Sequence, residues 1–104
     1  MISFDTIRIE FKDLDAEELG RWIAAELVRA EGPAGSWAFE EIDVARIRLI
    51  RELRHELEIE ERSLPVVLSL MDQLYDLRRR MTRLNEAMAE VPPDIKAVLL
   101  ARLG

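Results

Sequence analysis

Apolar and polar residues alternate near the start of the chain and then change to helical spacing. Alternation over residues 6–11 predicts a short strand with Ile7, Ile9 and Phe11 on one face. Over residues 15–28 the apolar positions recur three and four residues apart, which predicts an amphipathic helix. Asp and Glu three residues apart at its start form a capping-box pattern. We therefore expect one strand followed directly by one helix.

Glycine and proline interrupt this pattern over residues 31–36, between two apolar stretches, which predicts a small hairpin or wing. From about residue 41 to 56, apolar residues alternate with arginines, as in an amphipathic helix. Arg48 precedes Glu52 by four residues, so we expect the two side chains to pair on the exposed face. This segment, called the arginine helix below, carries Arg46, Arg48, Arg51 and Arg54.

The longest regular pattern is a heptad repeat in the C-terminal half, with apolar residues separated by alternating steps of three and four. The seam positions are Val67, Leu70, Leu74, Leu77, Met81, Leu84, Met88 and Val91. At 1.5 Å per residue the seam is more than about 30 Å long. This length exceeds the part of the seam that the first half of the chain could cover. We therefore expect a homodimer through this helix, and the flanking residues leave parallel and antiparallel pairing open. Pro92 and Pro93 end the repeat, and the last segment predicts a short amphipathic helix.

These patterns predict a mainly α-helical protein with a short β element. We expect a head over residues 1–60, a coiled-coil dimerisation helix over residues 61–91 and a short C-terminal helix over residues 92–104. The chain contains no Cys, which excludes disulfides, thiolate metal sites and cysteine nucleophiles. No apolar run is long enough to span a bilayer and no basic region precedes an apolar core at the N-terminus, so we expect a cytoplasmic protein.

The net charge of −6 is distributed unevenly. Residues 1–44 hold eleven acidic and four basic side chains, a net charge of −7, whereas residues 45–104 have a net charge of +1. A protein that binds duplex DNA neutralises phosphates with Lys and Arg, because counterion release supplies most of the non-specific affinity. The acidic charge of residues 1–44 therefore argues against DNA binding.

Residue types that carry catalysis or bind metals are sparse. His55 is the only histidine and follows Glu52 by three residues, a spacing used by carboxylate-bridged metal sites. Such sites need a second pair of this kind, so we interpret His55 as an ordinary surface or helix-end residue. Ser63 lacks a neighbouring base, and there is no glycine-rich phosphate loop. We expect neither an enzyme nor a cofactor or metal site.

Two blocks on either side of the predicted inter-helix turn resemble a known family. The sequences LRHEL (residues 53–57) and VVLSLMD (residues 66–72) resemble the corresponding stretches of CbpM-type chaperone modulators. The spacing of residues 37–54 also resembles the region after the winged helix-turn-helix of MerR-type regulators. Both groups begin with a helix-turn-helix, and in this chain the predicted strand replaces its first helix. The resemblance covers about residues 24–83 and implies a reduced MerR-like winged-helix head.

This resemblance implies a binding protein that occupies the J-domain of a CbpA/DnaJ-like co-chaperone and prevents it from stimulating its Hsp70 partner (DnaK). J-domains of that class present a basic helix, so an acidic modulator would compete for it by electrostatic steering. The partner-binding residues expected on this basis are Glu17, Glu18, Glu58, Glu60 and Glu61. Two alternatives stay open: a MerR-like DNA-binding regulator whose arginine helix contacts phosphates, and a coiled-coil adaptor without a chaperone connection.

Overall fold

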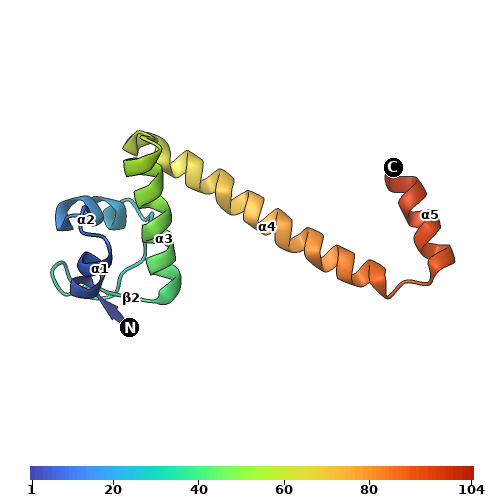
Figure 1. Ribbon diagram of the computed structural model, residues 1–104, viewed down its shortest axis with the longest axis horizontal. Helices are drawn as coiled ribbons and strands as arrows, with labels where there is room; N and C mark the ends of the chain where they lie inside the picture. The colour runs from blue at the N-terminus through green and yellow to red at the C-terminus, as the bar shows by residue number, and fades with distance from the viewer. The chain divides into compact units, whose positions relative to one another are not determined.

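The computed structural model describes all 104 residues and is mainly helical, as the sequence predicts (Figure 1). The elements are β1 (Ile2–Ser3), α1 (Phe4–Glu10), α2 (Ala16–Ala24), β2 (Ala38–Phe39), α3 (Glu41–Arg51), α4 (Leu64–Ala89) and α5 (Pro93–Leu103). A π-helical turn (Glu52–Glu56) extends α3, and a 3-10 turn (Glu61–Ser63) precedes α4. The predicted long helix and short C-terminal helix are confirmed. None of the helices combines the length and apolar character needed to cross a membrane.

The chain divides into two compact units, residues 1–68 and residues 69–104. The first unit, called the head below, contains both strands, α1 to α3 and the first residues of α4. The second unit contains the rest of α4 and α5. Each unit is considered by itself.

The strand predicted over residues 6–11 is wrong, because residues 6–10 belong to α1 and Phe11 caps its C-terminus. The side chains that matter are Phe4, Ile7 and Phe11, which are three and four residues apart and all buried. Ile9, which the alternating pattern placed on the same face, is 73% exposed. A helical period starting at Phe4, two residues before the alternating stretch, therefore explains the apolar positions better than a period of two.

Ser3 ends the true first strand and starts α1. Its side-chain oxygen accepts the backbone N–H of Thr6 at 3.3 Å, as expected of a residue that caps a helix N-terminus. β1 pairs antiparallel with β2, with Ile2 opposite Phe39. The small β element of the head is thus made by residues before α1 and before α3.

The start of α2 is predicted correctly and its end is not. The carboxylate of Asp15 accepts the N–H of Glu18 at 2.7 Å, which confirms the predicted cap. The Glu18 side chain contacts His55 instead of reaching back to the cap, so the second half of the capping box gives way to a tertiary contact. The helix ends at Ala24 rather than at residue 28.

A Schellman motif ends α2. The N–H of Leu27 bonds the carbonyl of Trp22 at 2.9 Å, and the N–H of Glu26 bonds the carbonyl of Ile23 at 3.0 Å. Glu26 has a φ of 61°, the left-handed conformation for which helices most often use glycine. A side chain at this position costs roughly 1 kcal/mol relative to glycine.

The turn-rich segment after α2 closes as predicted, although it forms a single bridge and not two strands. Glu31 and Ala38 exchange two backbone hydrogen bonds of 2.9 and 2.8 Å. Gly32 has a φ of 88°, and a Cβ atom there would lie 2.9 Å from the carbonyl oxygen of Ser36. Glycine is therefore required at this position both by the backbone conformation and by the available space.

The helix predicted over residues 41–56 is confirmed as α3 and its π-helical extension. Val44, Ile47 and Ile50 form its buried face and meet the buried residues of the other elements. The fully buried side chains of the head with the largest volumes are Trp22, Phe39, Ile7, Leu19, Ile47, Ile50, Leu64 and Leu68. The first turns of α4 thus contribute to the same core as α1, α2 and α3.

Candidate interaction surfaces

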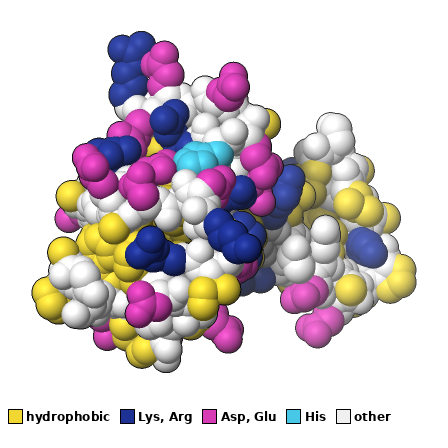
Figure 2. Space-filling model, turned by 60° about the vertical axis from the view of Figure 1, so that its left-hand side comes forward, with side chains coloured by type: hydrophobic (Ala, Val, Ile, Leu, Met, Phe, Trp, Pro, Cys, Tyr) yellow, Lys and Arg dark blue, Asp and Glu magenta, His cyan; other side chains and the backbone are white.

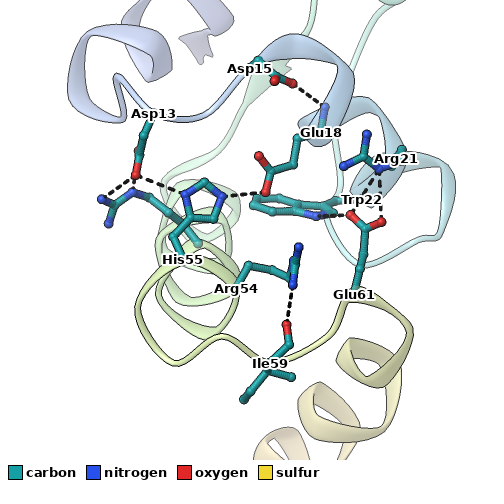
Figure 3. A network of polar contacts seen from close by, with 10 residues as sticks. Asp13, Asp15, Glu18, Arg21, Trp22, Arg54, His55, Ile59 and Glu61 are labelled. Carbon is teal, nitrogen blue, oxygen red and sulfur yellow. Dashed lines mark hydrogen bonds and ion pairs between the residues drawn. The ribbon is translucent and has the colours of Figure 1, made fainter.

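A polar network fixes the start of α2 to the end of α3 (Figure 3). His55 lies in the π-helical turn, with Nδ1 3.1 Å from Oδ2 of Asp13 and Nε2 2.7 Å from Oε1 of Glu18. Arg51 donates two hydrogen bonds to Asp13, of 2.8 and 2.9 Å. Because Asp13 lies in the connection between α1 and α2, these contacts hold both helices against α3.

The arrangement around His55 favours its charged form. Both ring nitrogens face carboxylate oxygens, and only the imidazolium can donate from both. The hydrogen bond to Glu18, and then that to Asp13, raise the pKa of His55 above its usual value of 6.5. Hydrogen bonding to Arg51 lowers the pKa of Asp13 to about 2. Figure 2 shows the single histidine surrounded by acidic and basic side chains.

We expect the head to lose stability as the pH rises above neutrality. A group whose pKa is raised by folding stabilises fully below its unfolded pKa, here 6.5, and this contribution is lost as the pH rises through the folded pKa. Urea unfolding at about pH 6 and about pH 9 should therefore give the lower midpoint at the higher pH. An NMR titration of the sole histidine should place its pKa above that of an unfolded peptide.

His55→Gln is the control for this pH dependence, because glutamine keeps a hydrogen-bond donor and cannot titrate. The variant should be less stable than the wild type at the lower pH and show a smaller decline between the two conditions. An equal decline in both proteins would mean that another group is responsible.

Glu61, immediately before α4, makes the second set of contacts in the network. Its carboxylate accepts a hydrogen bond of 3.2 Å from Nε1 of the buried Trp22 and forms an ion pair of 3.1 Å with Arg21. Nearby, Arg54 donates to the carbonyl of Ile59 at 2.6 Å. These bonds fix the inter-helix turn against α2, so Glu61 takes part in the fold of the head.

The five glutamates predicted to bind a partner therefore differ in their surroundings. Glu18 and Glu61 are both engaged within the head around Trp22, and the side chain of Glu18 is only 12% exposed. Glu17, Glu58 and Glu60 are exposed, and Glu60 pairs with Arg62 in its own turn. The binding role of all five stays a prediction.

All four arginines of the arginine helix have partners inside the head. The partners are Glu10 for Arg48, Asp13 for Arg51, and the carbonyls of Leu27 and Ile59 for Arg46 and Arg54. The expected pairing of Arg48 with Glu52 is thus wrong, because Glu10 at the end of α1 offers a partner across the helix packing. Cations that a DNA-binding protein would direct at phosphates are thus used within the head, where Arg48 and Arg51 hold α1 and its connection to α2 against α3.

The heptad seam of α4 is largely uncovered within the chain. Five consecutive seam residues of the second unit are between 48% and 60% exposed: Leu70, Leu74, Leu77, Met81 and Leu84. Val67, Met88 and Val91 are partly buried. Leu68, next to the seam, is buried in the core of the head. The stripe from Leu70 to Leu84 is therefore an apolar surface available to another helix.

The head also has an open groove where the end of α2, the closed turn and the start of α3 meet. Ile23 and Ile42 contribute apolar surface, and Arg29 is the single basic residue that lines it. Its acidic lining residues are Glu26, Glu31, Glu40 and Asp43. The groove could not be predicted from the sequence, because its residues come from three segments. The one signal in the sequence is Ile42, an apolar residue between two acids, which the structure shows to be 78% exposed.

Comparison with known protein families, with curated proteins and with solved structures finds no match. Membership of the CbpM-type modulators therefore stays a prediction from two short sequence blocks.

Proposed function

We propose that this protein is a chaperone modulator of the CbpM type, which binds the J-domain of a CbpA/DnaJ-like co-chaperone and keeps it from acting with Hsp70. Under this proposal it has no catalytic role and works as a homodimer joined through α4. The observation that carries the proposal is the internal pairing of the arginine helix beside exposed acidic residues. This distribution favours a basic protein partner over a nucleic acid.

The corrected start of the chain also supports the proposal. The resemblance implied a helix-turn-helix at the N-terminus, and a strand over residues 6–11 would have been a departure from it. The segment is instead α1, joined to α2 by residues 11–15, so two consecutive helices occupy the expected part of the chain. This support concerns the arrangement of elements, and fold alone does not determine function.

The DNA-binding alternative is disfavoured by the surface that α2 would present to a groove. Its first turn carries the exposed Glu17, which would repel phosphates. The basic residue of its last turn, Arg21, is paired with Glu61. The coiled-coil adaptor differs from our proposal only in the identity of the partner, so a binding experiment is needed to separate them.

The decisive experiment is an isothermal titration of the full chain with the isolated J-domain of the host's own CbpA-like co-chaperone, at two salt concentrations. We expect saturable binding that weakens as salt increases, because screening reduces attraction between an acidic and a basic surface. A duplex DNA titrated under the same conditions serves as the control and should not bind. Absence of heat and of a complex with the J-domain would overturn the proposed function.

A further inference from the structure

The groove at the end of α2 combines an exposed apolar side chain with uncommitted carboxylates. Ile42 is 78% exposed in the first turn of α3, and it also borders a second hollow beside the exposed Met1. The apolar lining therefore continues across Ile42 toward the N-terminus. An exposed isoleucine side chain does not stabilise the head, whereas covering it with a partner would make the free energy of apolar burial available to binding.

The acidic residues of the groove fall into two classes. Glu40 and Asp43 belong to the N-terminal cap of α3, where the Asp43 carboxylate accepts the backbone N–H of Glu40 at 3.0 Å. Glu26 and Glu31 come from the end of α2 and the closed turn and are exposed, and their carboxylates take part in no ion pair within the chain. The groove thus offers two free negative charges together with the apolar side chain of Ile42.

The acids of the inter-helix turn are less available than those of the groove. Leu57 beside Glu58 is 67% exposed, but Glu60 already pairs with Arg62 and Glu61 with Arg21. A partner that binds at the turn would have to compete with these ion pairs, whereas Glu26 and Glu31 have none to lose.

We propose that this groove binds a basic amphipathic helix of the protein partner, with Ile42 as the apolar contact and Glu26 and Glu31 as the flanking charges. This assignment rests on the proposed function and locates its binding site. A helix that carries apolar residues three and four positions apart between Lys or Arg residues complements the groove in both respects. The single basic lining residue, Arg29, does not offset the four acidic ones.

Two groove variants test the assignment by titration with the same J-domain. Ile42→Ala removes the apolar contact and should weaken binding about tenfold or more. The double variant Glu26→Gln and Glu31→Gln should weaken it to a similar extent at low salt and make it less sensitive to salt. Because all three side chains are exposed, thermal unfolding should stay close to that of the wild type.

The matched control is Glu86→Gln with Glu90→Gln, which changes the net charge by the same amount at exposed positions of the C-terminal half. It should alter the affinity by less than about twofold, since its charges lie outside the head. The turn variant, Glu58→Gln with Glu60→Gln, tests the inter-helix turn as the competing site. If the wild type binds and the groove variants bind equally well, the groove is not the site although the proposed function stands. If the wild type does not bind, the function fails and this site with it. Loss of binding only in the turn variant would move the site to the inter-helix turn.

Discussion

Trp22→Ala should leave the head largely unfolded at room temperature. Trp22 has no exposed surface and is the largest side chain of the core. Replacing a buried tryptophan by alanine costs about 3 to 5 kcal/mol. In a unit of the size of Met1–Leu68 a single core rarely supplies more than roughly 3 to 5 kcal/mol, so the loss removes most of the stability. The variant also deprives Glu61 of the indole N–H donor.

The second tryptophan provides the measurement. Trp37 lies edge-to-face against Phe4, with ring centroids 5.4 Å apart, and in Trp22→Ala it is the only indole. Its emission should already resemble that of the urea-unfolded chain in the absence of urea. Trp22→Phe keeps an aromatic ring in the core and should remain folded, with a lower urea midpoint. A Trp22→Ala protein with the wild-type midpoint would contradict the role assigned to this residue.

The parts of the fold that the sequence predicts correctly are those in which one period continues over several turns. α3 and α4 have apolar residues three and four positions apart over their whole length, so no other period fits them. The segment of residues 6–11 is too short for this test, since its apolar residues satisfy a period of two as well as a helical one. Phe4 and the cap at Ser3, both outside the segment, decide the outcome.

The end of α2 could not be predicted for a different reason. Helices usually mark a Schellman motif by glycine, and here the position is occupied by Glu26. Sequence rules that look for glycine extend the helix to residue 28, because Leu27 and Val28 continue the apolar pattern.

The polar network could not be predicted from the sequence, because its residues are far apart in the chain. His55 is 42 residues from Asp13 and 37 from Glu18. Placing them together requires the correct α1 and the angle at which it meets α3, neither of which a strand over residues 6–11 allows. For the same reason the sequence predicts that Arg48 pairs with Glu52, four residues away, and not with Glu10. Charge counts along the chain gave the acidic character of the head but not which carboxylates remain free.

The seam on α4 gives the second large effect. Under the proposed pairing, Leu74→Glu with Leu77→Glu should convert the dimer into a monomer. Glutamate and leucine have similar helix propensities, so α4 itself should persist. Each buried leucine contributes about 1.5 kcal/mol or more, and the two copies lose four of them, which weakens association by a factor of roughly 10⁴. Sedimentation should show wild-type particles of twice the 12.1 kDa chain mass and variant particles of the single mass.

Tyr75→Glu distinguishes pairing through the seam from non-specific association of exposed apolar residues on the helix. Tyr75 is 66% exposed, more than the 51% and 55% of Leu74 and Leu77, and it lies between them off the heptad positions. If association were driven by exposed apolar area alone, this variant would weaken the dimer as well. If the heptad seam is the interface, Tyr75→Glu stays dimeric while the double leucine variant does not. A wild-type chain that sediments as a monomer at micromolar concentration would remove the dimer from the proposal and leave the groove of the head as the binding surface to test.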